Sequence, residues 1–196
     1  MPMQSTVRSF VALALLLIAS TAAPAATIQI VAFGDSATKG FLVARKDAYP
    51  AQLQAALRAK GHDVEVHNAG VNGDTAAGAL RRFDMAIAPG TDIAIVEFGT
   101  NDLRRGVSMQ KVQAGVSEIV RSFRARHIQV LVVGLGGLDF SAVAKANGAA
   151  YAQWRLPPDK YRARDGAHFN AEGYALLVKR MLPAVEALIG RATRGR

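Results

Sequence analysis

The sequence predicts an α/β protein in which one parallel sheet of five strands lies between two layers of helices. Short apolar segments rich in β-branched residues alternate with longer amphipathic segments, which is the pattern of strands joined by helical crossovers. Glycine, proline and helix-capping residues lie between these segments, where the chain must turn. With right-handed crossovers, such a chain forms a three-layer sandwich that binds ligands at the carboxyl ends of its strands.

The first elements follow from apolar runs and from the residues that bound them. Residues 27–33 (TIQIVAF) form a buried first strand. Pro50 suits the first turn of a helix and Gly61 ends it, so we expect a helix over residues 50–60. A second strand follows at residues 63–67.

The middle of the chain continues the same alternation. Asp74 or Thr75 can cap a helix that runs to Ala88, where a Pro-Gly pair ends it. A third strand follows at residues 92–98 (DIAIVEF).

The next elements complete the sheet. Ser108 caps a helix that we expect to run to about Ala125, before a fourth strand at residues 128–135. A short helix at residues 141–147 ends at a glycine and leads into a short fifth strand at residues 149–154.

The last helix begins after Asn170. Pro183 lies inside this helix and has no amide hydrogen to donate. We therefore expect the helix to be kinked or split near residues 180–182.

The composition predicts one domain that folds without metal ions or disulfides. The chain has 196 residues, of which 51% are hydrophobic, so it can bury a sufficient core. It has no cysteine, which excludes thiol catalysis, zinc–thiolate sites and iron–sulfur clusters. A net charge of +9 first suggests nucleic acid or an anionic membrane surface as a partner.

Residues 1–25 have the features of a secretory signal peptide. The apolar run at 10–18 is too short to span a bilayer, and Ala-Pro-Ala at 23–25 fits the pattern before a cleavage site. We expect one mature domain over residues 26–196, periplasmic or secreted, without a nucleic-acid partner and with its basic surface free to touch the cell envelope. The alternative is an uncleaved membrane anchor or a buried first helix.

Four polar clusters lie where the predicted fold places its ligand-binding edge. Three of them directly follow predicted strands, and the fourth precedes the last helix. They are residues 34–36 (Gly-Asp-Ser), 68–75 (Asn-Ala-Gly-Val-Asn-Gly-Asp-Thr), 99–102 (Gly-Thr-Asn-Asp) and 165–168 (Asp-Gly-Ala-His). Because parallel strands end at the same edge of a sheet, these clusters should converge.

Together the clusters contain the groups that serine-based acyl transfer needs. A serine hydroxyl is a weak nucleophile until a base takes its proton, and His168 is the best base available to Ser36. Asp165 can accept from the imidazole and fix its tautomer. The backbone amides of Ser36 and Gly73 and the side-chain amide of Asn101 can stabilise an oxyanion, each such donor contributing about two to three orders of magnitude in turnover.

At these clusters the sequence resembles the SGNH (GDSL-type) hydrolase family, and more closely its bacterial exported branch of small esterases and thioesterase/lysophospholipase-type enzymes. The resemblance extends over about residues 27–189 and implies five parallel strands in a flavodoxin-like order. The positions that match the family's motifs are Ser36 for the nucleophile, Gly73 and Asn101 for the oxyanion hole, and Asp165 and His168 for the Asp-x-x-His pair.

Some residues depart from the family pattern. Ala37 stands where the family commonly has leucine, Lys39 where it has a small residue, and Phe169 where proline is common. The segment 134–164 is shorter than in the thioesterase-like relatives, which place a substrate-covering loop and a helix there. We infer a shallow acyl pocket that favours short acyl groups, unless a partner or other side chains rebuild the wall, the candidates being Tyr151, Trp154 and Tyr161.

Other polar residues of the chain could have either a functional or a structural role. The three aspartates next to glycine-containing turns suggest a site for a hard cation, but we interpret them as turn and cap groups and expect no metal site: they are Asp35, Asp74 and Asp102. The remaining histidines lack a ligand-spaced partner and are interpreted as structural: they are His62, His67 and His127. Arg104 and Arg105 form a solvated face, or together with Lys39 attract anionic substrate groups.

The sequence therefore predicts an exported serine hydrolase that cleaves small carboxylic esters or thioesters through an acyl-enzyme and needs no cofactor. Ser36 is the expected nucleophile, His168 the general base and then acid, and Asp165 the orienting residue. An alternative within the same family is removal of acetyl groups from a carbohydrate or cell-wall polymer. An alternative of another class is a non-catalytic module that binds an anionic polymer or membrane through its basic surface.

Overall fold

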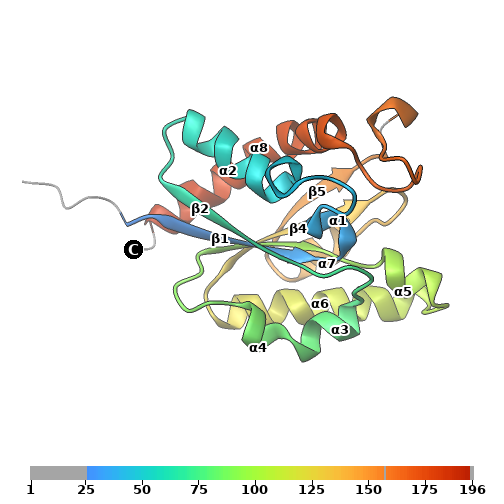
Figure 1. The fold of residues 1–196 in the computed structure, drawn as a ribbon. Helices are drawn as coiled ribbons and strands as arrows, with labels where there is room; N and C mark the ends of the chain where they lie inside the picture. Colours follow the sequence, from blue (N-terminus) through green and yellow to red (C-terminus); the bar gives the residue numbers. More distant parts are fainter. Residues whose placement is uncertain (1–25, 157, 195–196) are drawn as a thin grey trace, which may run out of the picture.

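The computed structural model describes residues 26–156 and 158–194 and confirms the predicted α/β class (Figure 1). Five parallel strands form one sheet in the order β2-β1-β3-β4-β5, which is the flavodoxin-like order. The strands are β1 (Ile28–Gly34), β2 (Val64–Gly70), β3 (Ile93–Glu97), β4 (Gln129–Leu135) and β5 (Ala150–Trp154). The predicted signal peptide, residues 1–25, lies outside the described residues.

Helices of very different lengths connect the strands. The α-helices are α1 (Ser36–Lys39), α2 (Tyr49–Ala59), α3 (Ala76–Arg81), α4 (Phe83–Ala86), α5 (Thr100–Arg104), α6 (Met109–Ala125), α7 (Ser141–Ala146) and α8 (Ala171–Arg194). Two short 3-10 helices are η1 (Arg45–Asp47) and η2 (Asp159–Tyr161). The sequence did not predict α1 or α5, which begin inside two of the polar clusters.

The helices cover both faces of the sheet (Figure 1). α2 and α8 pack against one face, and α3, α4 and α6 pack against the other. Side chains alternate along β1, so that Ile30 belongs to the first of these cores while Val31 and Phe33 belong to the second. Because both faces of the sheet are covered, β1, β3 and β4 are nearly continuous apolar runs in the sequence.

β2 is an edge strand that is protected by side chains from α2. The amide of Val66 donates to the side-chain oxygen of Gln54 at 2.7 Å, and the Arg58 guanidinium donates to the carbonyl of Val64 at 2.9 Å. These bonds occupy backbone groups that would otherwise be free to pair with another strand. β2 extends three residues beyond the predicted end, His67, because its pairing with β1 continues to Gly70.

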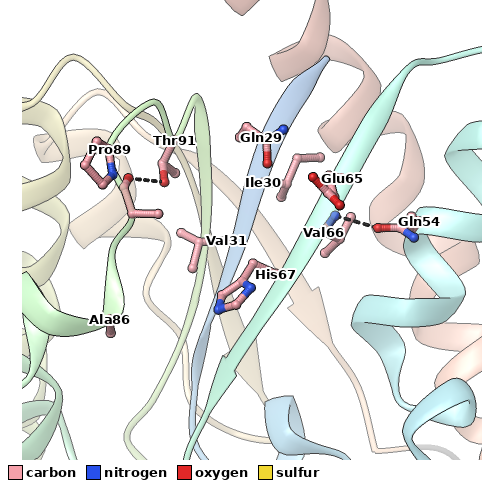
Figure 2. Close-up of a pocket in the computed structure, with 11 residues that line it drawn as sticks. Gln29, Ile30, Val31, Gln54, Glu65, Val66, His67, Ala86, Pro89 and Thr91 are labelled. Atoms are coloured by element: carbon pink, nitrogen blue, oxygen red, sulfur yellow. Dashed lines mark hydrogen bonds between the residues drawn. The ribbon is translucent and has the colours of Figure 1, made fainter.

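The face of β2 that no helix covers borders a hollow of about 370 Å³ (Figure 2). Figure 2 shows Val31 of β1 and His67 of β2 side by side, with Pro89 and Thr91 of the segment before β3 across from them. This hollow lies along the strands and not at their carboxyl ends, and it contains none of the predicted site residues. His67 is exposed there.

The single helix predicted from Asp74 or Thr75 to Ala88 is two helices instead. Thr75 caps α3, as one of the predicted alternatives has it, and its hydroxyl accepts from the amide of Gly78. α3 then ends at Arg82, whose side chain turns back to the ends of β1 and β2 and does not follow the helix surface. This long-range contact explains why local helix propensity failed to predict the break.

The prediction that Pro183 splits the last helix is wrong, because α8 runs unbroken from Ala171 to Arg194. Met181 and Val185 flank the proline, and both are completely buried in the core beside α2. Packing on both sides of the proline thus compensates for one missing hydrogen bond. Within the described part of the chain, neither α8 nor any other helix is long and apolar enough to cross a membrane.

Candidate active site

Ser36 lies at the point where β1 turns sharply into α1. Asp35 caps α1, its carboxylate accepting from the amide of Ala37 at 2.9 Å. The preceding Gly34 has no room for a side chain, because a Cβ would lie 2.0 Å from the Thr38 hydroxyl oxygen and 2.7 Å from the carbonyl oxygen of Glu97. The Gly-Asp-Ser sequence is therefore what allows this turn to pack against the end of β3.

His168 and Asp165 come from the loop before α8 and meet Ser36 there. His168 Nε2 is 2.8 Å from Ser36 Oγ, and His168 Nδ1 is 2.6 Å from Asp165 Oδ2. The bond between Ser36 and His168 joins residues that are 132 positions apart in the chain. A histidine that donates from Nδ1 to Asp165 presents Nε2 as an acceptor for the serine hydroxyl.

The carboxylate of Asp165 is fixed by more than the imidazole. Its other oxygen accepts from the backbone amides of Ala167 at 3.1 Å and His168 at 3.0 Å. The bonds from the backbone and the ring of His168 hold the pKa of Asp165 well below its usual range. Asp165 is therefore ionised wherever the protein is folded near neutral pH.

An aromatic ring that the sequence analysis missed packs on the imidazole. The centroids of the Phe41 and His168 rings are 4.9 Å apart, and Phe41 is 38% exposed. Phe169, the departure from the family pattern, turns instead into the core, where its ring packs against that of Tyr174. One sequence carries no signal for the first contact, because Phe41 and His168 are distant in the chain.

Asn101 lies beside the Ser36 turn, as predicted. Its side-chain amide nitrogen donates to Asp35 Oδ2 at 2.8 Å and to the carbonyl oxygen of Asp74 at 3.0 Å. Both amide hydrogens thus point to acceptors within the protein. Asn101 can donate to an oxyanion at Ser36 only if one of these two hydrogens is shared or redirected. The hydrogen on the neutral carbonyl of Asp74 is the easier one to redirect, because that bond is weaker than the bond to the Asp35 carboxylate.

Gly73 lies in the loop next to Asn101 but not in the wall of the hollow around Ser36. Its φ angle of 72° lies in the left-handed region that favours glycine. Its carbonyl accepts from the Arg105 guanidinium at 2.8 Å. Of the three predicted oxyanion donors, the structure brings Ser36 and Asn101 to the hollow. Gly73 does not line the hollow, and it is the next residue, Asp74, that contacts Asn101 through its carbonyl.

Arg82 joins the loops that carry these groups, and the sequence analysis did not find it. Its guanidinium donates to the Asp74 carboxylate at 2.7 Å, to the carbonyl of Ala69 at 2.9 Å and to that of Gly34 at 3.2 Å. It also lies over the Phe33 ring, 4.4 Å from the centroid. One side chain therefore holds together the ends of β1 and β2 and the loop after Gly73.

The three cations that the sequence places near the site occupy different positions. Arg104 lines the Ser36 hollow and makes no hydrogen bond or ion pair within residues 26–156 and 158–194. Arg105 is engaged by Gly73, and Lys39 lines a separate hollow of about 270 Å³ beside Phe41. Only Arg104 is thus placed to meet a bound substrate directly.

The three aspartates suspected of cation binding act as turn and cap groups, as interpreted. Asp35 caps α1, and Asp74 accepts from the amide of Thr75. Both oxygens of Asp102 lie 3.2 Å from the amide of Ala76, at the start of α3. These bonds account for all three carboxylates without a cation.

The hollow around Ser36 is small, about 40 Å³, and opens beside a groove of about 440 Å³. The groove has four leucines, a glycine turn and two arginines in its wall, and none of its lining residues is acidic: the residues are Thr100, Leu103, Arg104, Leu135, Gly136, Gly137, Leu138, Leu156, Arg162, Gly166 and Ala167. None of the three aromatic residues named as candidates to rebuild the wall lines the groove. Trp154 is completely buried against Tyr49, Tyr151 bonds Gln153, and the segment after β5 contributes Leu156 to the wall.

Comparisons with known proteins agree with this arrangement. Residues 32–156 match the model of the GDSL-like lipase/acylhydrolase family. The chain is 32% identical over 148 residues to the esterase TesA of Pseudomonas aeruginosa, covering 72% of each protein. It is 30% identical over 101 residues to an arylesterase of Vibrio mimicus, covering 51% of this chain and 50% of that protein.

Solved structures give the same result. The SGNH-hydrolase family esterase AlinE4 is 31% identical, with a TM-score of 0.66 over 83% of this chain and 96% of its own. A crystal structure of TesA is 24% identical and shares the fold, with a TM-score of 0.74 over 82% and 99% of the two chains. The sequence match, the sheet order and the residues gathered at the ends of the strands lead to one conclusion: the chain belongs to the GDSL-like lipase/acylhydrolase family, also called the SGNH hydrolases.

Proposed function

We propose that this protein hydrolyses carboxylic esters or thioesters through an acyl-enzyme formed on Ser36. The observation that carries the proposal is the unbroken series of hydrogen bonds from Ser36 Oγ through the His168 ring to Asp165. Relatives at 30% identity or above are named as esterases, which supports the same class of reaction.

The first half-reaction transfers the acyl group to the enzyme. As Ser36 Oγ attacks the ester carbonyl, its proton moves to Nε2 of His168, and the ionised Asp165 stabilises the resulting imidazolium. The carbonyl electrons move to oxygen, where the amide of Ser36 donates together with the Asn101 hydrogen that leaves the carbonyl of Asp74. Gly73 lies outside the wall of the hollow and contributes only after a shift of its loop. When the carbonyl re-forms, the bond to the leaving group breaks, and His168 gives its proton to the departing oxygen or sulfur.

The second half-reaction restores the enzyme. Water attacks the acyl carbon while His168 takes one of its protons, and the acid product leaves as the Ser36 oxygen recovers that proton. No cofactor takes part in either half.

We propose that the acyl group is short, because the hollow that contains Ser36 measures only about 40 Å³. Turnover of p-nitrophenyl esters should therefore fall steeply from acetate or butyrate to dodecanoate, because longer chains do not fit the hollow and the methylenes outside it gain no apolar burial. The measurement is kcat/KM over an acyl-length series, repeated with thioester and acetylated-sugar leaving groups. Equal or better hydrolysis of the dodecanoyl ester would mean that the neighbouring apolar groove binds the acyl chain.

We further propose that Arg104 favours substrates that carry a negative charge. Its guanidinium borders both the Ser36 hollow and the groove, and the groove has no acidic side chain. Arg104→Gln should lower kcat/KM for p-nitrophenyl hemisuccinate about three- to fivefold, an effect of the size usual for partly exposed charge pairs. It should leave the uncharged butyrate ester nearly unchanged.

The control for this prediction is Arg121→Gln, which removes an exposed arginine of α6. The preference for the charged ester should also weaken as salt concentration rises. An unchanged ratio between the two esters in Arg104→Gln would contradict a role for Arg104 in substrate choice.

A further inference from the structure

A buried acid lies directly behind the Ser36 turn. Glu97 is the last residue of β3, it is completely buried, and it pairs in register with Gly34. One of its oxygens accepts from the Thr38 hydroxyl at 3.1 Å. The other oxygen, Oε1, is buried and has no hydrogen-bond partner among the described residues.

In the part of the chain that the structure describes, the groups facing Glu97 carry no positive charge. The groups that face it are Asp35 and Thr38 of the α1 turn, Tyr49 of α2 and Tyr174 of α8. Burial raises the pKa of both tyrosines, so these rings are neutral. An ionised Glu97 would therefore be a buried charge beside a second carboxylate, without a compensating cation.

The neighbouring carboxylate, Asp35, has a different set of bonds. It is 2% exposed, and it accepts from the Ala37 amide through one oxygen and from the Asn101 side chain through the other. His168 and Asp74 are the further charged or titratable groups that face it. Asp35 thus has two well-placed hydrogen-bond donors for a negative charge, whereas Glu97 accepts from the Thr38 hydroxyl and has only a weaker contribution from the backbone amide of Asp35.

A second negative charge next to a buried carboxylate is unfavourable, so two adjacent buried carboxyls tend to share one proton. Burial and the nearby Asp35 raise the pKa of Glu97 well above its usual range, and burial also raises that of Asp35. The difference in hydrogen bonding decides where the proton resides. The two donors on Asp35 favour the negative charge there and the proton on Glu97.

We propose that Glu97 carries a proton in the working enzyme and is a positioning residue for the oxyanion donor Asn101. The protonated Glu97 leaves the negative charge on Asp35, and that charge fixes the side-chain amide of Asn101. The inference rests on the proposed esterase function. A charged acceptor holds one amide hydrogen of Asn101 more firmly than a neutral one would. The nitrogen therefore stays in place while its other hydrogen leaves the carbonyl of Asp74 for the oxyanion.

The kinetic test compares two substitutions of similar size. Glu97→Gln keeps an uncharged N–H group next to Asp35 and an oxygen for Thr38, so kcat should stay within about fivefold of the parent enzyme. Glu97→Leu removes both, and kcat on p-nitrophenyl acetate should fall about 10- to 100-fold with KM within about threefold, because the lost contact matters in the transition state. Glu65→Gln, on the exposed face of β2, is the matched control and should change neither constant.

The effect should act through Asn101. In an Asn101→Ala background, adding Glu97→Leu should lower kcat by less than about twofold, because the group that Glu97 positions is already missing. An equal loss in both backgrounds would overturn the proposal. Ser36→Ala distinguishes failure of the esterase mechanism from failure of the positioning role. Activity that survives Ser36→Ala refutes the mechanism, whereas a normal kcat in Glu97→Leu refutes only the positioning role.

The proton on Glu97 has its own readout in thermal stability. Above about pH 4.3, the ordinary pKa of glutamate, the unfolded parent chain releases this proton while the folded chain keeps it, so folding loses stability as pH rises. Glutamine does not titrate. The Tm of Glu97→Gln minus that of the parent should therefore increase from pH 4.5 to pH 8.

Two outcomes would contradict the protonated form of Glu97. A Tm difference that stays flat or falls with pH would show that Glu97 ionises in the folded protein as easily as in the unfolded chain. A loss of kcat in Glu97→Gln as large as in Glu97→Leu would show that a neutral donor does not suffice. The first result can be obtained even if Glu97→Leu fails to fold.

Discussion

Ser36→Ala should reduce ester hydrolysis by about six orders of magnitude in kcat, to the level that the oxyanion donors and substrate binding alone can sustain. In the proposed mechanism the Ser36 oxygen forms the acyl-enzyme, and among the described residues no other serine is hydrogen-bonded to His168. The measurement is release of p-nitrophenol from p-nitrophenyl acetate, with circular dichroism to verify the fold. In the parent enzyme, mass spectrometry after rapid acid quench should find the acetyl group on the peptide that contains Ser36.

The matched control is Ser122→Ala on α6, where the hydroxyl bonds only the carbonyl of Glu118. Its activity should equal that of the parent. Hydrolysis that persists in Ser36→Ala, or an acetyl group found on another residue, would refute the mechanism.

His168→Ala should lower kcat by about four to six orders of magnitude, because it removes both the base that activates Ser36 and the acid that protonates the leaving group. The loss should be seen with the same ester, and the acyl-enzyme should no longer form within the burst period. Asp165→Asn should lose less, because it leaves the imidazole present but favours the wrong tautomer.

The control for this prediction is His67→Ala, which truncates the exposed histidine in the larger hollow of Figure 2. It should retain full activity. A loss in His67→Ala comparable to that in His168→Ala would move the reaction from the ends of the strands to the uncovered face of β2.

The fold could be predicted because its signals are local or periodic. Strands covered on both faces give apolar runs, and residues such as Pro50 and Ser108 mark helix starts where the structure has them. The polar clusters could be predicted to converge because parallel strands end at one edge. The structure brings Ser36, Asp165 and His168 within hydrogen-bond distance there, while their catalytic roles stay predictions for the experiments above.

What the sequence did not predict depends on contacts between distant segments. Arg82 ends a helix because its side chain reaches two strand ends, and Pro183 does not end one because core residues flank it. Phe41 meets His168 only after the last helix has docked. Glu97 looks like the polar end of a strand in the sequence, and only the packing of α1, α2 and α8 isolates it from solvent.

The hydrogen bond between Ser36 and His168 also sets when the protein becomes reactive. Its two ends are 132 residues apart, so at about 5–20 residues per second the ribosome adds His168 roughly 7 to 26 s after Ser36. Before His168 is added, the chain has its serine but not the proposed base. Ester hydrolysis by the proposed mechanism therefore requires the loop before α8 to reach Ser36, and the onset of activity during refolding would report that contact.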